Sequence, residues 1–273
     1  MSSVPQLPLR ILFKGPSTLV WTSMMSGPRT DLVFPRVMEA ELIQRHRQVD
    51  TWNAARNGWL TRDLFATWED EISSWSPDIV VMTPAHMETV HAILPPRLER
   101  GANAVSRLPG RFRRLYYRRI LRGLARFVLH VQRRVDAPGR FQGRVKRALG
   151  YTDEYLRITQ QVQNPLILLL ELHQPTQKKI DWFPGWPARR ELLNDGLRQL
   201  ADRYDNVRFV SISDLMGQFD PGTPEDLWAD GIHFSSAFHR AIGEKLAAIA
   251  DDWAASQAHL GGVQLAAVPV VPA

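Results

Sequence analysis

The chain has 273 residues, with 34 Lys and Arg against 28 Asp and Glu, and a net charge of +6. A hydrophobic fraction of 44% and a charged fraction of 23% are typical of a soluble globular protein with a substantial core. The sequence contains no cysteine, which excludes thiol catalysis, disulfide bonds and metal sites built on Cys ligands.

Two stretches bear on the cellular compartment. Met1–Leu9 has neither a basic start nor a long apolar core, so it lacks the pattern of a signal peptide. The longest apolar run, Leu166–Leu170, is far too short to cross a bilayer. Together with the lack of cysteine, these features favour a cytoplasmic protein.

Short apolar segments alternate with segments of helical spacing along the chain. The predicted strands are Leu9–Lys14, Gln48–Ala54, Asp78–Thr83, Pro165–Leu172 and Val207–Ile212. The predicted helices are Pro35–Arg47, Thr61–Trp75, Arg189–Tyr204 and Phe234–Trp253. Apolar strands that alternate with helices indicate a parallel sheet buried on both faces. Because crossovers between parallel strands are right-handed, we expect a three-layer α/β/α sandwich with a five-stranded parallel sheet.

One long interruption, Glu88–Gln163, separates the third and fourth predicted strands, where a simple crossover needs far fewer residues. Its centre, Arg111–Val135, has helical spacing, and arginines fill many of the remaining positions. We interpret the interruption as a helical cap or insertion within a single α/β domain of residues 1–255. Residues 256–273 finish in Val-Pro-Val-Val-Pro-Ala and are expected to form a flexible tail.

Positive charge is concentrated in this insertion. Between Arg97 and Arg147 the sequence has 16 Lys and Arg against two acids, a net charge of +14, so the rest of the chain carries −8. Three interpretations are open: a solvated helical face, a site for an anionic acyl donor such as acyl-CoA or an acyl carrier protein, and a surface that touches anionic lipid at the membrane periphery. Nucleic acid is disfavoured as a partner, because the charge is confined to one insertion and no recognised nucleic-acid module accompanies it.

In open parallel sheets, ligands bind beyond the carboxyl ends of the strands. The segments that leave those ends contain Ser17, Asn57–Trp59, His86 and His173, and Trp228–His233 follows the fifth strand. We therefore expect Ser17 and His233, far apart in the sequence, at the same rim of the sheet. A hydroxyl with a basic partner and backbone donors beside it is what nucleophilic catalysis requires.

The segment Asp230–His233 lies just before the last predicted helix. A carboxylate three residues before a histidine can accept a hydrogen bond from one ring nitrogen and leave the other nitrogen free to take a proton. Ser235 or Ser236 can cap the helix that follows, which would place His233 on a stiff loop-to-helix junction. Ordinary turn and capping roles for Asp230 and His233 remain the alternative.

These segments together resemble the sequence blocks of the SGNH (GDSL-type) hydrolase superfamily. Gly15-Pro16-Ser17 is similar to its Gly-Asp-Ser block, Asn53–Gly58 to its second block, and Asp230–His233 to its terminal Asp-x-x-His block. The resemblance covers roughly residues 9–85 and 166–250 and leaves the insertion outside.

The resemblance implies a serine esterase-like mechanism. Ser17 would attack an ester or thioester carbonyl, His233 would act as base and then as acid, and Asp230 would orient His233. The backbone N–H groups of Ser17 and Gly58 would hold the oxyanion. No cofactor is implied, and we find no convincing metal site, since Glu39 and Glu41 do not pair with any histidine at metal-ligand spacing.

Two departures from the family pattern affect the expected chemistry. Pro16 replaces the Asp of Gly-Asp-Ser, which is not the triad acid, and proline pre-sets φ at a tight turn. The third block, which normally reads Gly-x-Asn-Asp, aligns with Ala85–Glu88, and Met87 cannot donate the hydrogen bond of the usual Asn. Loss of one oxyanion donor costs about 10²–10³ in rate. Either His86 supplies a donor in its place or His86 is a plain loop residue.

A closer resemblance extends to Gly58–Asp63 and to the basic insertion. Both are similar to an actinobacterial branch of the superfamily that includes an octanoyltransferase, which implies acyl transfer to a sugar or another alcohol. Candidate substrate contacts are Trp59, His173 and Trp182, the last within an aromatic, Pro-rich loop at the same rim. Hydrolase and acyltransferase activities both stay open. The alternative class is a non-catalytic protein that binds an anionic or acyl ligand through the arginine-rich insertion.

Overall fold

The computed structural model describes residues 7–20, 33–56, 58–84, 86–90, 92–93, 122–174, 176–219 and 227–260. Several sequence predictions fall outside these ranges. They concern Asn57, Ala85, the first part of the helical stretch Arg111–Val135, and residues 261–273 of the predicted tail.

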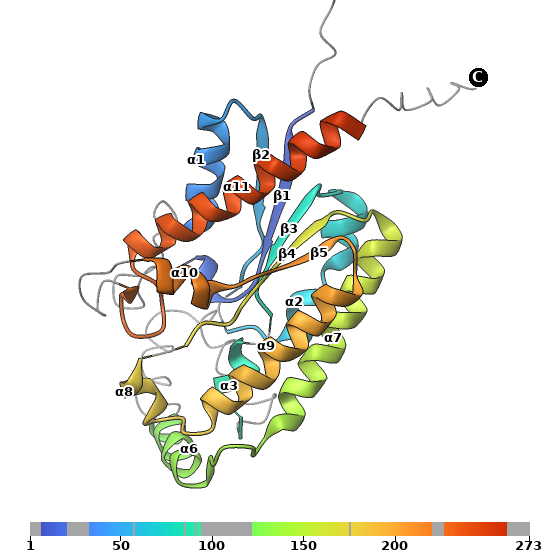
Figure 1. The fold of residues 1–273 in the computed structure, drawn as a ribbon. Helices are drawn as coiled ribbons and strands as arrows, with labels where there is room; N and C mark the ends of the chain where they lie inside the picture. Colours follow the sequence, from blue (N-terminus) through green and yellow to red (C-terminus); the bar gives the residue numbers. More distant parts are fainter. Residues whose placement is uncertain are drawn as a thin grey trace, which may run out of the picture.

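A five-stranded parallel sheet forms the centre of the fold (Figure 1). In spatial order the strands are β2 (Val49–Asn53), β1 (Leu9–Lys14), β3 (Ile79–Met82), β4 (Leu166–Leu170) and β5 (Val207–Val210). All neighbouring pairs are parallel, and β3 and β4 are buried along their whole length. This arrangement confirms the predicted α/β architecture. The prediction was possible because strands made only of apolar side chains need cover on both faces.

One face of the sheet is covered by α1 (Phe34–Gln44) and α11 (Ser236–Leu260), which pack against each other (Figure 1). The short α10 (Ile212–Gln218) joins them on this side. Phe238, Ile242 and Leu246 recur every four residues and form the buried stripe of α11.

The other face carries α2 (Thr61–Phe65), the π-helical turn η3 (Glu69–Ser74), α7 (Gln142–Val162) and α9 (Trp186–Arg203). Helix α7 lies inside the stretch predicted as a helical insertion. Its Val145, Ala148, Tyr155 and Leu156 are buried in the same cluster as the side chains of β3 and β4. The C-terminal part of the predicted insertion, helix α7, is therefore part of the helix layer of the sandwich.

The remaining short helices lie beyond the carboxyl ends of the strands: α3 (His86–Val90), α6 (Arg122–Val135) and α8 (Gln177–Ile180) (Figure 1). A buried ion pair joins this region to the core. Arg189 of α9 donates to both carboxylate oxygens of Asp136, just after α6, and its Nε donates to the carbonyl of Thr89 at 2.7 Å. Both members of the pair are fully buried, so this pair fixes α6 against α3 and α9.

Three predicted boundaries differ from the structure in instructive ways. The predicted helix Thr61–Trp75 is broken after Phe65, where a turn leads into η3. The last helix starts at Ser236, because Phe234 forms an isolated antiparallel bridge with Trp228. It also runs to Leu260, so residues 256–260, predicted as part of a flexible tail, are helical. Within the described part of the chain, no helix is long and apolar enough to span a membrane.

Candidate active site

The loops that leave β1, β2 and β3 are joined by backbone hydrogen bonds at one edge of the sheet. Ala54 N–H donates to the carbonyl of Phe13 and Arg56 N–H to that of Gly15, each at 2.9 Å. Thr83 N–H donates to the carbonyl of Lys14 at 3.0 Å. The chain after β1 is thus held between its two neighbours as it turns toward Ser17.

Ser17 opens the short 3₁₀ turn η1 (Ser17–Leu19) directly after this edge. Pro16 precedes it in an extended conformation, with φ of −81° and ψ of −167°. Ser17 is half-buried, and no described residue accepts a hydrogen bond from its backbone N–H. The side chain and the N–H group of Ser17 are therefore both available at the rim.

Beneath this loop lies a buried ion pair that sequence reasoning missed. Lys14, the last residue of β1, is 1% exposed and donates to Glu71 and, at 3.1 Å, to the hydroxyl of Thr67. Burial lowers the pKa of Lys14, against the opposing effect of the Glu71 carboxylate. The available signal was a lysine that directly follows the apolar run Ile11–Phe13 of β1, since a buried cation requires a partner.

The loop Asp230–His233 is organised by one carboxylate. Asp230 Oδ1 accepts from the backbone N–H groups of Ile232 at 3.0 Å and His233 at 2.9 Å, and its Oδ2 lies 2.9 Å from His233 Nδ1. Gly231 sits between them with φ of +84°, in the left-handed region that side chains disfavour. The ring of His233 is 2% exposed. A single acid thus sets both the turn and the orientation of the ring.

The two loops meet at Ser17 and His233. Ser17 Oγ lies 2.9 Å from His233 Nε2, across 216 residues of sequence. With Nδ1 of His233 donating to Asp230, Nε2 is left to accept the hydroxyl proton. The structure therefore brings together the three side chains that the sequence analysis singled out, in the order hydroxyl, imidazole and carboxylate.

His173, a predicted substrate contact, is buried beneath the Asp230–His233 loop. It is 3% exposed, and its Nε2 donates to the carbonyl of Ile232 at 2.9 Å. Its ring packs against Trp228 and Phe234, with centroid separations of 4.9 and 4.4 Å. Burial holds the pKa of His173 well below its usual value, and the charge of His86 adds to this shift. A neutral, donating His173 supports the loop from below.

His86 is the first residue of helix α3 and does not lie in a loop. The side chain is 7% exposed. Its ring stacks on His173 at 5.9 Å and meets the edge of Trp186 at 5.8 Å. The neighbouring Met87 is half-buried and offers no donor. The structure therefore places His86 in the buried aromatic layer under the rim.

The other predicted contacts lie in two places. Gly58 is buried with φ of +70°, a conformation that favours glycine, and it closely follows Arg56, which is bonded to the Ser17 loop. Trp59 packs on the core beneath α2 and α7, with the Arg56 guanidinium 5.8 Å from its ring.

Trp182 follows α8 and is 42% exposed. It lines a groove of about 600 Å³ between α6 and α8, together with Arg126, Phe127, Leu129, His130, Lys179 and Phe183. Metal-binding clusters of three His, Asp or Glu side chains do not occur within the described ranges.

No protein-family model matches the chain, and no curated protein matches its sequence. Solved structures do match. A lipase/acylhydrolase from Enterococcus faecalis gives a TM-score of 0.55 at 16% identity, over 90% of this chain and 96% of that one. A family 3 carbohydrate esterase from Clostridium thermocellum gives 0.55 at 15% identity, over 92% and 100%. A protein described as a GDSL-like lipase from Parabacteroides merdae gives 0.55 at 16% identity, over 86% and 92%.

These matches extend over most of both chains in each pair. At such low identities they establish a shared fold and leave the activity to be argued from this chain's own residues. The actinobacterial branch is not tested by them and stays a prediction. The chain has the fold of the SGNH (GDSL-type) hydrolase superfamily.

Proposed function

We propose that this chain is a serine acyl-ester enzyme in which Ser17, His233 and Asp230 form a catalytic triad. The observation that carries the proposal is the 2.9 Å separation of Ser17 Oγ and His233 Nε2, with Asp230 Oδ2 2.9 Å from His233 Nδ1. Names given to proteins of the same fold, such as lipase/acylhydrolase and carbohydrate esterase, support an ester substrate.

The proposed reaction follows from this geometry. Ser17 Oγ attacks the carbonyl carbon of an ester or thioester, and its proton passes to His233 Nε2. His233 then gives the proton to the departing alcohol or thiol, which leaves an acyl group on Ser17. Water or an acceptor alcohol attacks this acyl-enzyme and gives its proton to His233. The bond between the acyl carbon and Ser17 Oγ then breaks, His233 returns the proton to Oγ, and the acyl product leaves. Asp230 stabilises the imidazolium that forms in both halves of the reaction.

The oxyanion of the tetrahedral intermediate needs donors near Ser17. We assign the backbone N–H groups of Ser17 and Gly58 to this role. No residue that the structure describes accepts from the N–H of Ser17, which supports the first assignment. The bond from Arg56 N–H to the carbonyl of Gly15 supports the second, because it keeps the Gly58 loop beside Ser17. His86 is the remaining candidate donor, and its burial in the aromatic layer argues for a weaker contribution.

The groove beside Trp182 offers an apolar surface for the acyl chain. Leu129 lines the groove, and Ile232 belongs to the Asp230–His233 loop. Both pack on the cluster of Val90, Phe183 and Trp186. Lys179, which also lines the groove, lies beside the Asp230–His233 loop, since a Cβ at Gly231 would be 3.5 Å from its Cε. An acyl chain in this groove would be directed along that lysine toward His233.

Labelling with a fluorophosphonate tests the nucleophile. The reagent should form a phosphorus–oxygen bond with Ser17 Oγ, release fluoride, and add its mass to the peptide that contains Ser17. Ser17→Ala should abolish the label and lower kcat/KM on p-nitrophenyl acetate by about 10³-fold or more. Ser256→Ala, which changes an exposed serine of α11, is the matched control and should keep both label and turnover. An unlabelled wild type, or full turnover in Ser17→Ala, contradicts the proposal and favours a non-catalytic binding protein.

The acyl acceptor is decided in the same assay. Products of an acyl-CoA or p-nitrophenyl ester are followed by mass with and without sugar alcohols. Free acid as the sole product at every acceptor concentration identifies a hydrolase, and an acylated alcohol identifies a transferase.

A chain-length series tests the groove. Each buried methylene is worth about 0.8 kcal/mol, so the loss of contact with about two methylenes changes a rate ratio by about tenfold. Trp182→Ala should therefore lower the octanoate-to-acetate ratio of kcat/KM by about tenfold. Turnover of acetate should stay near wild type. Ile43→Ala, an exposed apolar residue on α1, is the control and should leave the ratio unchanged. An unchanged ratio in Trp182→Ala would place the acyl chain elsewhere.

A further inference from the structure

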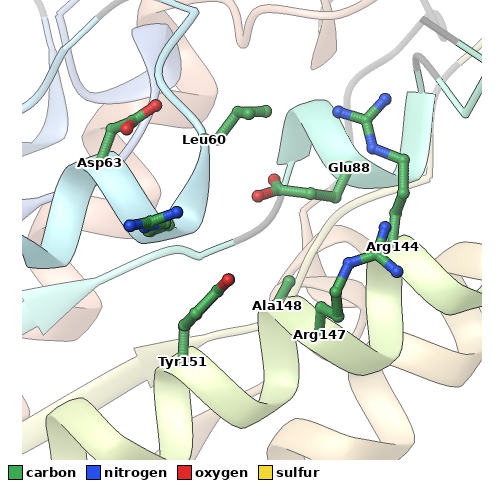
Figure 2. A pocket seen from close by; sticks show the side chains of 8 residues that line it. Leu60, Asp63, Glu88, Arg144, Arg147, Ala148 and Tyr151 are labelled. Carbon is green, nitrogen blue, oxygen red and sulfur yellow. The ribbon is translucent and has the colours of Figure 1, made fainter. Parts of the chain in front are cut away.

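A second pocket, separate from the groove and from the triad, lies where α2, α3 and α7 meet (Figure 2). Its volume is about 110 Å³, several times the roughly 30 Å³ that one water occupies in the liquid. Figure 2 shows Glu88 pointing from α3 into the space between α2 and α7, with Tyr151 pointing toward it from α7. Three arginines and two carboxyl groups line this pocket, so its lining carries a net positive charge.

Glu88 is the buried polar group of the pocket. It is 6% exposed, and its Oε1 accepts from the backbone N–H of Thr61 at 2.7 Å. Its Oε2 is buried and has no hydrogen-bond partner among the described residues. A buried polar atom without a partner is unfavourable, and native proteins rarely leave one unexplained. The pocket in front of Oε2 is the place from which a ligand can satisfy it.

Two exposed arginines line the same pocket, Arg62 of α2 and Arg147 of α7. Neither forms a hydrogen bond or ion pair with any described residue. Guanidinium groups present planar forks of donors that match the oxygens of phosphate or sulfate. Because these two groups come from different helices, they suit a tetrahedral group better than a planar one.

We propose that this pocket binds a tetrahedral oxyanion, the phosphate or sulfate group of a small ligand, between Arg62, Arg147 and Glu88. Water alone would satisfy Glu88 Oε2 but would leave both guanidinium groups without an anion. An oxyanion accepts from all three side chains, provided that Glu88 carries a proton. This binding site is independent of the reaction at Ser17, so it stands whether or not Ser17 is a nucleophile.

The protonation of Glu88 gives the site a pH dependence with a definite sign. Burial raises the pKa of Glu88. Hydrogen bonds from the backbone N–H groups of Thr61 and of Glu88 itself, the Thr61 hydroxyl and the charge of Arg144 oppose this rise only in part. The charged and titratable groups around Glu88 are Arg62 and Asp63 on α2, Arg144, Arg147 and Tyr151 on α7, the paired Arg189 on α9, and His86 on its own helix. A protonated Glu88 donates to the anion and an ionised one repels it, so affinity should fall as the pH rises through the raised pKa.

The test is a calorimetric titration of the full chain with sodium sulfate, whose charge is constant from pH 5.5 to 8, at ionic strength matched with NaCl. We expect saturable binding that is tighter at pH 5.5 than at pH 8. Arg62→Gln and Arg147→Gln should each weaken it by about tenfold, the effect of one charge-assisted hydrogen bond. Glu88→Gln keeps an acceptor for Thr61 N–H and offers an amide donor, so it should bind sulfate and lose the pH dependence.

Arg157→Gln, on the exposed side of α7, is the matched control and should bind as the wild type does. Inorganic phosphate should bind like sulfate, whereas acetate should bind more weakly. The proposal is overturned if sulfate does not saturate any site, if Arg147→Gln and Arg157→Gln bind it equally, or if Glu88→Gln keeps the full pH dependence. Tighter binding of acetate than of sulfate would overturn the assignment to a tetrahedral group.

Discussion

The loop that carries Asp230 and His233 and the loop that carries Ser17 meet at 2.9 Å but are stabilised in different ways. The first is organised from within, because Asp230 holds its own turn and its own histidine within three residues, and His173 adds one bond from below. The second depends on distant segments. The end of β1 that leads into it is held by backbone bonds from Arg56 and Thr83 and by the ion pair of Lys14 with Glu71.

Because the two loops are stabilised differently, we expect substitutions in them to affect different properties, the reaction rate in one case and the folding free energy in the other. A change at Asp230 should alter the hydrogen bonding of the His233 ring more than the stability of the fold. A change beneath the Ser17 loop should remove a buried charge partner and destabilise the layer between β1 and η3. Variants on the two sides of the Ser17–His233 contact should therefore divide into those that lose rate and those that lose folding free energy.

Asp230→Asn should give the largest effect on rate. The Asn carbonyl oxygen can still accept from Ile232 and His233 N–H, so the turn is retained. Its amide then donates toward His233 Nδ1, which moves the ring proton to Nε2 and blocks acceptance of the Ser17 proton. We expect kcat on p-nitrophenyl acetate to fall by about 10³–10⁴, with a melting temperature close to wild type.

Asp181→Asn, an exposed acid at the end of α8, is the matched control for this variant and should keep full kcat. A rate within tenfold of wild type in Asp230→Asn would remove Asp230 from the triad. A large loss of melting temperature would instead mean that the loop depends on the charge of Asp230 for its structure.

The same contrast explains what the sequence could predict. The strands and their parallel order follow from short apolar runs such as Ile79–Met82, whose burial on both faces leaves few alternatives. Asp230 and His233 were found because their interaction is local and has a fixed spacing. Ser17 was placed beside them by the rule that ligands gather at the carboxyl ends of parallel strands.

Other features depend on contacts that no local pattern records. The helix predicted over Thr61–Trp75 is interrupted where Thr67 and Glu71 turn toward Lys14, a partner more than fifty residues away. His173 follows a strand, as a pocket residue would, but its ring turns inward to support Ile232. The arginines around α7 concealed its apolar stripe, so a helix of the core layer was predicted as part of an insertion.

Lys14→Met should give the smaller but still substantial effect, on stability. It leaves Glu71 buried without its cation, and breaking such a pair costs about 3–5 kcal/mol of unfolding free energy, measured by urea denaturation. The double variant Lys14→Met with Glu71→Leu should recover much of the loss, since an apolar pair in the same space has no charge to solvate. Arg10→Met, an exposed cation on the same strand, should cost no more than about 1 kcal/mol. If Lys14→Met costs no more than Arg10→Met, the ion pair does not stabilise the Ser17 loop, and the backbone bonds from Arg56 and Thr83 alone hold it in place.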